Sequence, residues 1–458
     1  MLGRTKSIHF VGIGGIGMSG IAEFLFNQGL VITGSDMRKS ELTDHLESIG
    51  IKVVEGHDSD LALDADVVVK SSAVTDDNPE IKKALNSHIP VIRRAEMLAE
   101  ITRMSIGIGL AGTHGKTSTT SMVGMILDAA ELDPTIIVGG RVKNFGSNNI
   151  IGSGKYIVVE ADEYDHSFLT LSPIFAGITN IDADHLDCYK DLDAIKDAFV
   201  EYANKVPFFG CVVVCLDDKG VQDILPRINK RIMTYGFSRQ ADLQAINLKF
   251  KNFRASFDVV FNSYKLGSID LQVTGKHNIQ NALNAIGIAL ELDIPFESIQ
   301  AGLNSYSGVF RRFEYKGEAK DIIVYDDYAH HPTEIIATLE GFRESTDKRI
   351  VLIFQPHLYS RTRDFHQEFG RSFFSCDLLF IAPIYPAREE PIPGITSQLI
   401  ADSAVKTGHQ NVHYIENMDD MVDVVMSHLK PNDIVVTMGA GTIYKKGEEI
   451  LERLNEGK

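Results

Sequence analysis

A loop that ends in Gly-Lys-Thr is the part of this chain best equipped to do chemistry. It runs Ala111-Gly112-Thr113-His114-Gly115-Lys116-Thr117, after an apolar run and before a helical stretch that opens with Ser118. In loops of this kind backbone N–H groups hold phosphate, the lysine reaches the outer phosphates and the threonine hydroxyl ligates Mg²⁺. The strict spacing is broken, because Leu110 stands five residues before the second glycine. The segment still predicts a binding site for a nucleoside triphosphate.

A second glycine-rich loop lies near the N-terminus. Gly12-Ile13-Gly14-Gly15-Ile16-Gly17 follows an apolar run and opens a helical stretch, and Asp36 ends the next strand-like segment. Glycines let the backbone approach a phosphate, and the positive end of the helix favours its charge. One interpretation is NAD, with Asp36 on a ribose. The same loop would hold any nucleoside diphosphate, so the pattern predicts a nucleotide without identifying it.

Two phosphate loops in one chain change the interpretation of each. A dehydrogenase has no use for a second loop of the Gly-Lys-Thr type, whereas an enzyme that energises one bound ligand with ATP needs both. A binding protein regulated by a nucleotide is a third possibility, which the acidic and histidine residues at later strand ends disfavour. We therefore expect the two loops on separate domains, each with its own ligand.

Strand-like and helix-like runs alternate along the chain, which predicts doubly wound α/β domains with mainly parallel sheets. We expect a Rossmann-like domain over 1–104, a central P-loop ATPase-type domain with a mixed sheet over 105–311, and a second Rossmann-like domain over 312–458. Alternating polar and apolar residues from Asp242 to Val273 predict antiparallel strands in the central domain. The strongest strands are expected at Ser7–Val11, Tyr156–Glu160, Phe175–Asn180, Val212–Leu216, Ile322–Tyr325, Ile350–Phe354 and Ile434–Met438, and helices at Ile16–Phe26, His277–Leu290 and from Pro332.

Length and composition fit an enzyme of this kind. The 458 residues suggest about three domains, and 45 Lys+Arg against 62 Asp+Glu give a net charge of −17. Nucleic acid and anionic membranes need clustered cations, so neither is an expected partner. We find no apolar run of the ~18 residues that a spanning helix needs, and no signal peptide. The 4 cysteines form no CxxC pair, so we expect a soluble cytoplasmic protein with reduced thiols.

Several segments resemble the Mur ligase family, the ATP-dependent amide ligases of peptidoglycan precursor synthesis. They are GTHGKT (112–117), VVEADEYD (158–165), TNIDADHLD (179–187), GKHNIQNA (275–282), FRRFE (310–314), DDYAHHPTE (326–334) and QPHLYSRTRDF (355–365). The resemblance spans essentially the whole chain. GIGGIGMSGIA (12–22), DDYAHHPTE and YPAREEPI (385–392) are similar to members that join L-alanine to UDP-N-acetylmuramate, and a relative that recycles muramyl tripeptide shares part of the pattern. The resemblance therefore implies a UDP-sugar, not NAD, in the first loop.

The family's chemistry implies a role for each segment. ATP would convert the lactyl carboxylate of UDP-N-acetylmuramate into an acyl phosphate, which the amine of L-alanine attacks. The implied catalytic residues are Lys116, Glu160, His185, Arg312 and His330, with Mg²⁺ on Thr117, Glu160 and His185, and with Asp162 and Glu163 as alternates near Glu160. ATP would contact Gly112, Thr113, His114, Gly115, Lys116, Thr117, Ser118, His277, Asn278, Asn281, Arg312 and Asp327. The UDP-sugar would contact Gly12, Gly14, Gly15, Ile16, Gly17, Ser35, Asp36, Ser71 and Ser72.

The same resemblance places the incoming amino acid in the last domain. The residues implied around it are Tyr328, His357 and Arg361. Arg361 would hold its carboxylate, and His330 would orient or deprotonate its amine. Relatives often read PHRYTR where this chain has Pro356-His357-Leu358, so an arginine that they offer to the substrates is absent. No carbamylated lysine is assigned, and Lys196 is expected to be an exposed helix lysine. The expected protein is a monomer or homodimer.

Overall fold

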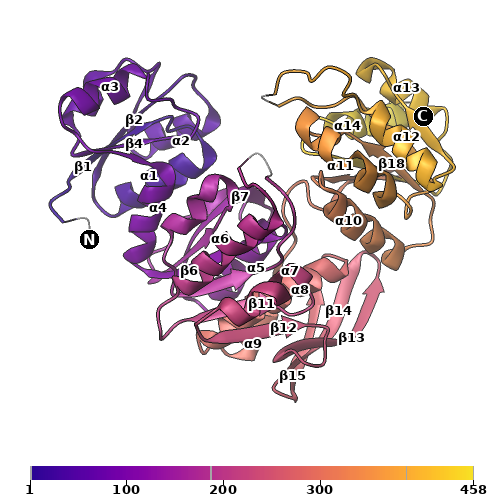
Figure 1. The fold of residues 1–458 in the computed structure, drawn as a ribbon, viewed down its shortest axis with the longest axis horizontal. Helices are drawn as coiled ribbons and strands as arrows, with labels where there is room; N and C mark the ends of the chain where they lie inside the picture. Colours follow the sequence, from indigo (N-terminus) through magenta and orange to yellow (C-terminus); the bar gives the residue numbers. More distant parts are fainter. Residues whose placement is uncertain (1–2, 186–187, 388, 457–458) are drawn as a thin grey trace. The chain divides into compact units, whose positions relative to one another are not determined.

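The structure is a computed structural model that describes residues 3–185, 188–387 and 389–456. Three sheets organise the chain, each with helices beside it (Figure 1). This is the predicted three-domain α/β architecture. Leu186 and Asp187 of the 179–187 segment and Arg388 of the 385–392 segment lie outside the described residues.

The first sheet is fully parallel and has the strand order β3-β2-β1-β4-β5. Its order reverses beside β1, and ligands of open α/β sheets bind at such a reversal, beyond the carboxyl ends of the strands. The glycine loop follows β1 at this point. The strands are β1 (Ser7–Val11), β2 (Val31–Asp36), β3 (Lys52–Glu55), β4 (Val67–Lys70) and β5 (Val91–Arg93), and the helices are α1 (Ile16–Asn27), α2 (Glu41–Ser48), η1 (Asp60–Asp64), α3 (Pro79–Asn86) and α4 (Arg94–Arg103).

The second sheet has the order β15-β14-β13-β12-β11-β10-β6-β9-β7-β8. Its middle is parallel and nearly continuous in Val, Ile and Leu, as expected for strands covered on both faces. The strands are β6 (Ile106–Ala111), β7 (Thr135–Val142), β8 (Ser147–Ile150), β9 (Tyr156–Glu160), β10 (Phe175–Ile178), β11 (Cys211–Cys215), β12 (Ile232–Gly236), β13 (Leu243–Lys251), β14 (Arg254–Phe261) and β15 (Tyr264–Leu271). The helices are α5 (Lys116–Ala129), η2 (Tyr164–Thr170), α6 (Leu192–Asn204), α7 (Lys219–Ile224), η3 (Leu225–Arg227), α8 (Lys276–Glu291) and α9 (Phe296–Ser305).

The end of this sheet contains the antiparallel strands that the sequence predicted. Two-residue turns with positive φ at both positions, Asn252-Phe253 and Asn262-Ser263, connect β13 to β14 and β14 to β15. Such turns match the twist of antiparallel hairpins. The hairpin β7–β8 was not predicted. The expected strand Phe175–Asn180 ends early, at Ile178, because Thr179 and Asn180 turn to support the Gly-Lys-Thr loop.

The third sheet has the order β16-β17-β21-β18-β19-β20, with β16 antiparallel to β17 and the other pairs parallel. It is the second Rossmann-like sheet that was predicted. Its strands are β16 (Glu314–Ala319), β17 (Ile322–Asp327), β18 (Ile350–Phe354), β19 (Leu378–Ile381), β20 (Val412–Tyr414) and β21 (Ile434–Met438), and its helices are α10 (Pro332–Ser345), α11 (Tyr359–Ser372), α12 (Gln398–Thr407), η4 (Met418–Asp420), α13 (Met421–Met426) and α14 (Tyr444–Glu456).

The chain divides into two compact units. The first comprises 1–246, 258–269 and 280–306, and the second comprises 247–257, 270–279 and 307–458. One apolar core in the first unit includes residues of both of its sheets, such as Ile8 and Val212. The domain boundaries at 104/105 and 311/312 stay predictions.

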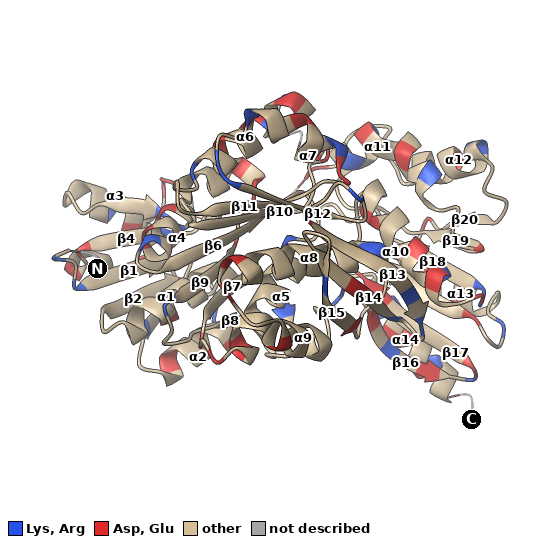
Figure 2. Ribbon diagram, turned by 90° about the horizontal axis from the view of Figure 1, so that it is seen from below, with Lys and Arg blue, Asp and Glu red and all other residues tan. Residues whose placement is uncertain are grey.

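Charged residues of both signs are interspersed along surface helices such as α11 and α12 (Figure 2). All 4 cysteines are free thiols. Within the described residues, no helix is both long enough and apolar enough to cross a membrane.

Candidate active site

The Gly-Lys-Thr loop connects β6 to α5 and is held by the residues that follow the neighbouring strand β10. Gly112 and Gly115 have φ of +133° and +84°, which favour glycine over residues with a side chain. The Asn180 side chain accepts from the His114 N–H at 2.8 Å, and the Thr179 hydroxyl donates to the His114 carbonyl at 2.6 Å. The first N–H groups of α5 have no partner within the helix. They are therefore suited to bind phosphate.

Lys116 lies at the centre of the loop and is charged. Its Nζ donates to the carbonyls of Gly112 at 2.8 Å and Thr113 at 3.2 Å, and to Glu163 Oε2 at 2.7 Å. Burial alone would lower the pKa of Lys116, but the nearby carboxylates, Glu163 foremost, outweigh burial and raise it. The lysine is therefore a fixed cation over the loop, paired with one carboxylate.

Two acidic groups at the end of β9 lie beside the loop. Glu160 accepts from the Thr117 hydroxyl at 2.9 Å and from the Gly139 N–H at 2.8 Å. Glu163 is buried, and its Oε1 has no hydrogen-bond partner but lies 3.6 Å from His185 Nε2. The structure thus brings Thr117 together with Glu160, and His185 together with Glu163.

These groups fit a divalent cation. Ligand atoms of Asp162, Glu163 and His185 lie within 4.8 Å of one another. Glu163 Oε1, which has no hydrogen-bond partner, is a carboxylate oxygen of the kind that binds divalent cations. In the prediction from sequence, Glu163 is only an alternate to Glu160 as a metal ligand. Its contact with Lys116 depends on how the turn after β9 folds, and the sequence does not reveal that.

The N-terminal glycine loop is largely held by its own domain. The N–H groups of Gly12 and Ile13 donate to the Ser35 carbonyl at 2.8 and 3.0 Å. The Gly14 N–H donates to Asp36 Oδ2 at 2.8 Å. Ile16 and Gly17 are the first residues of α1, so their N–H groups have no partner within the helix.

Two of the residues expected to contact the UDP-sugar have partners within their own domain, and their contact with the UDP-sugar stays a prediction. The Ser35 side chain is fully buried and bonds Glu80 and His57, so it supports the loop. The Asp36 carboxylate is engaged by the loop itself. Ser71 and Ser72 follow β4, and a Cβ at Gly12 would lie 3.0 Å from that of Ser71, so Ser71 adjoins the loop. Ser72 is exposed.

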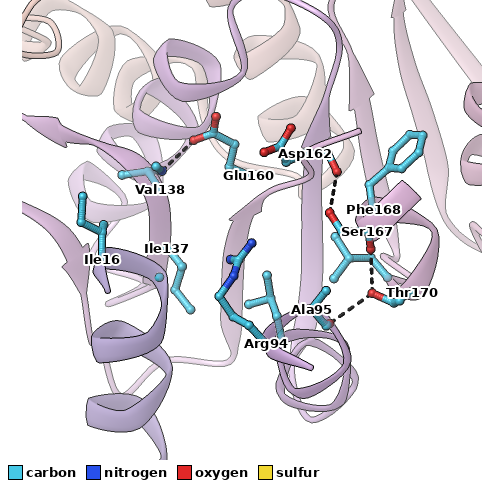
Figure 3. Close-up of a pocket in the computed structure, with 14 residues that line it drawn as sticks. Ile16, Arg94, Ala95, Ile137, Val138, Glu160, Asp162, Ser167, Phe168 and Thr170 are labelled. Atoms are coloured by element: carbon cyan, nitrogen blue, oxygen red, sulfur yellow. Dashed lines mark hydrogen bonds between the residues drawn. The ribbon is translucent and has the colours of Figure 1, made fainter. Parts of the chain in front are cut away.

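A cavity of about 230 Å³ lies between the start of α1 and the end of β9 (Figure 3). One end is lined by Ile16 and Gly17 at the start of α1, and another by Glu160 and Asp162 after β9. Glu160 also accepts a hydrogen bond from Thr117, so this end of the cavity adjoins the Gly-Lys-Thr loop. Arg94 of α4 lines it as well.

The first turns of α8 carry the three residues predicted to contact ATP. Asn281 packs against Gly115, where an added Cβ would collide with its side-chain oxygen. Asn278 donates to the Thr274 carbonyl at 2.7 Å and lies 3.1 Å from His277 Nε2. His277 Nδ1 is buried without a partner. Burial, supported by the Arg312 charge, lowers the pKa of His277 to about 4, so this side chain is neutral near pH 7.

In the third domain Arg312 and its neighbour Arg311 each pair with a carboxylate. Arg312 lies 3.1 Å from Glu334 and above the Tyr328 ring. Arg311 bonds Asp326 at 3.0 Å and the Gly439 carbonyl at 2.7 Å, between the rings of Tyr328 and Tyr444. In the prediction from sequence, Arg312 is favoured over Arg311 as the phosphate contact only because of the family resemblance.

Asp327 bonds backbone groups of its own domain, and its contact with ATP stays a prediction. It is buried, and its carboxylate accepts from the N–H groups of Phe313 at 2.7 Å and Ala329 at 2.8 Å. Burial raises the pKa of Asp327, although the Arg312 charge opposes this. The side chain thus joins the segment after Arg312 to the end of β17.

The residues predicted around the amino acid lie together. The His330 ring is 5.3 Å from that of Tyr328 and 5.7 Å from that of His357. Arg361, which is 8% exposed, lies 3.4 Å from His357 Nδ1. Tyr385, which the sequence did not single out, stacks on His357 at 5.9 Å. Leu358 has a φ of +72°, unusual for this residue type.

Lys196 is a helix lysine as predicted, but its side chain is only 15% exposed, and two carboxylates pair with it. It lies on α6 and pairs with Asp223 at 2.8 Å and Asp193 at 3.6 Å.

Comparison with known proteins identifies the family. Residues 7–105 match the model described as Mur ligase family, catalytic domain, residues 110–289 match the Mur ligase middle domain, and residues 311–441 match the Mur ligase, glutamate ligase domain. The chain therefore belongs to the Mur ligase family.

Individual relatives cover the chain from end to end. It is 51% identical over 454 residues to the UDP-N-acetylmuramate–L-alanine ligase of Geotalea uraniireducens, covering 99% of each chain. Among solved structures, the UDP-N-acetylmuramate–alanine ligase of Thermotoga maritima is 29% identical with a TM-score of 0.79, covering 99% of this chain and 100% of that one. The murein peptide ligase of Psychrobacter arcticus is 26% identical with a TM-score of 0.68, covering 98% of each.

Proposed function

We propose that this protein joins L-alanine to the lactyl carboxylate of UDP-N-acetylmuramate and converts ATP to ADP and phosphate. The observation that carries the proposal is the 51% identity to a UDP-N-acetylmuramate–L-alanine ligase over 99% of both chains. The two glycine-rich loops support it, together with a cavity that extends from the start of α1 to Glu160 beside Thr117. The domains 1–104, 105–311 and 312–458 would bind the UDP-sugar, ATP and the amino acid, respectively. The protein would act in the cytoplasm, where ATP is supplied.

The first step transfers the γ-phosphoryl group of ATP to the substrate carboxylate, and ADP leaves. A carboxylate does not react with an amine directly because oxide is a very poor leaving group. Lys116 would exchange Glu163 for the phosphoryl oxygens and offset their developing charge. Asn278, Asn281 and His277 would contact the adenine, since amides offer both a donor and an acceptor.

The second step forms the amide. The amine of L-alanine attacks the acyl carbon, the tetrahedral intermediate collapses and phosphate leaves. Arg361 would hold the amino-acid carboxylate, and His330, next to Glu334 at 3.2 Å, would orient the amine or accept its proton. Arg312 would reach phosphate from the third domain.

Mg²⁺ would be held by Thr117 and Glu160 and, at a second position, by Glu163 and His185. The ions would neutralise phosphate oxygens during transfer. Glu163 Oε1, which has no hydrogen-bond partner, supports this assignment.

The test is the substrate dependence of phosphate release. ATP turnover should require UDP-N-acetylmuramate, L-alanine and Mg²⁺ together, with one amide formed for each ADP. Multiple-turnover phosphate release without UDP-N-acetylmuramate would contradict the proposal.

A second candidate is ligation of a free muramyl peptide, which the murein peptide ligase structure supports at 26% identity. A competition assay that offers alanine, glycine, serine and tripeptide in one mixture separates the two. The first proposal predicts that the alanine product accumulates fastest, and preferred use of the tripeptide would favour the second.

A further inference from the structure

Arg94 is a cation that lines the cavity described above, and no step of the proposed reaction uses it. It is the first residue of α4, it is partly buried, and it lines the cavity together with Gly17, Glu160 and Asp162. Figure 3 shows its guanidinium extending from α4 toward the side where Glu160 and Asp162 lie.

The surroundings of the Arg94 side chain favour the binding of an anion there. Among the described residues, no hydrogen bond or ion pair engages the Arg94 side chain. An arginine at the first position of a helix faces the positive end of the helix dipole, which disfavours its charge, although Glu96 in the same turn offsets part of this effect. A guanidinium pairs in a bidentate manner with a carboxylate or phosphate.

The start of α1 is shaped to admit this side chain. A Cβ at Gly17 would lie 2.9 Å from Arg94 Nη1, closer than real side chains approach one another. The glycine at position 17 therefore leaves room for the guanidinium beside the N-terminal loop, in addition to any contact with the UDP-sugar.

We propose that Arg94 binds the lactyl carboxylate of UDP-N-acetylmuramate and positions it for phosphorylation. The inference rests on the function proposed above. The carboxylate has to extend from the glycine loop toward the γ-phosphate on the Gly-Lys-Thr loop. The cavity that Arg94 lines extends from Gly17 to Glu160, and Glu160 bonds Thr117 of that second loop. The opposite wall carries Glu160 and Asp162, so a cation is needed there to hold an anion.

The experiment compares two nucleotides that differ in the carboxylate. UDP-N-acetylglucosamine shares the uridine, diphosphate and amino sugar but lacks the lactyl group. Isothermal titration measures the binding of both to wild type, Arg94→Met and Arg94→Lys. Arg93→Met is the matched control, because Arg93 is exposed and precedes the same helix but does not line the cavity.

Arg94→Met should weaken the binding of UDP-N-acetylmuramate roughly 10- to 100-fold and leave that of UDP-N-acetylglucosamine unchanged. Arg94→Lys should fall between wild type and Arg94→Met, and Arg93→Met should bind both as wild type does. Retained UDP-N-acetylglucosamine binding also shows that the variants fold.

Two outcomes would overturn the inference alone. Equal losses for the two nucleotides would assign Arg94 to the diphosphate or to folding, and no loss would remove it from the site. If wild type bound neither nucleotide, the proposed function itself would fail, which is a distinguishable result.

Discussion

At the scale of single residues, some buried charges of the candidate site already have a partner of opposite charge. A substrate that binds such a charge would have to displace this partner. The Lys116–Glu163 pair is the clearest case, with 2.7 Å between the ammonium and the carboxylate. Without a ligand, Glu163 is the hydrogen-bond acceptor and counter-charge of Lys116. With ATP bound, the lysine would turn to phosphate and Glu163 would be left for a cation.

Lys116→Ala should lower kcat by at least roughly 10²- to 10³-fold, because one fixed charge at the transferring phosphoryl group is lost. Binding of UDP-N-acetylmuramate should be nearly unchanged, since its loop belongs to another sheet. Coupled-assay kinetics and titration calorimetry measure the two effects. Lys196→Ala, which removes a helix lysine paired with Asp223, is the control and should retain activity. Loss of UDP-sugar binding in Lys116→Ala would contradict separate binding domains.

His277 should make stability depend on pH. Its pKa is about 4 in the folded state against 6.5 without burial, so below pH 6.5 the unfolded chain binds a proton that the folded chain does not. Stability should therefore fall by roughly 1–2 kcal/mol between pH 7 and pH 5 through this group. Arg312 adds to the effect and Glu334 opposes it. Urea unfolding of His277→Gln should show a smaller pH dependence than wild type, and an identical dependence would contradict this cause.

At the scale of elements, the loops that follow parallel strands are positioned by the strands beside them. Asn180 after β10 supports the Gly-Lys-Thr loop after β6, and Ser35 and Asp36 of β2 hold the glycine loop after β1. Both pairs of strands are adjacent and parallel. The phosphate sites are therefore fixed by sheet register as much as by their own glycines.

The turn between β13 and β14 places Phe253 in an aromatic cluster of the second unit. Its ring lies 5.2 Å from Tyr325, 5.9 Å from Phe313 and 6.0 Å from Phe342. Phe253→Ala should cost roughly 1–3 kcal/mol in the free energy of unfolding, from lost burial and ring contacts. Phe208→Ala is the control, because Phe208 is 89% exposed and should change stability little. Equal effects in urea unfolding would refute the role of the cluster.

At the scale of the whole molecule, the chain has a net charge of −17 while both principal substrates are anions. We therefore expect binding to depend on local groups, for which the two loops, Lys116, Arg312, Arg361 and bound cations are the proposed candidates. The division into two compact units separates the UDP-sugar and Gly-Lys-Thr loops, in the first, from the residues predicted around the amino acid, in the second.

Calorimetry should resolve two unfolding transitions, because each unit has its own apolar core. UDP-N-acetylmuramate at 100 times its Kd should stabilise the first unit by about 2.7 kcal/mol and raise only its transition. Limited proteolysis at intermediate temperature assigns the transitions. A shift of both transitions together would show that the units unfold as one.

The sequence by itself determined the elements and the two loops. Apolar runs, glycines and Pro332 predicted β1, β9, β18, β21 and the start of α10 at the observed residues, because local hydrophobic periodicity and backbone preferences are written in neighbouring residues. The family resemblance added the roles, most of which remain predictions.

Only the tertiary structure decided which side chains are presented to a ligand. Ser35 and Asp327 carry suitable groups, but packing turns both toward their own domain, whereas Glu163 and Arg94 are brought to the site from separate segments. Such outcomes depend on contacts between residues far apart in the chain. The sequence shows that a carboxylate or a guanidinium is present, but not whether that group is paired, buried or accessible to a substrate.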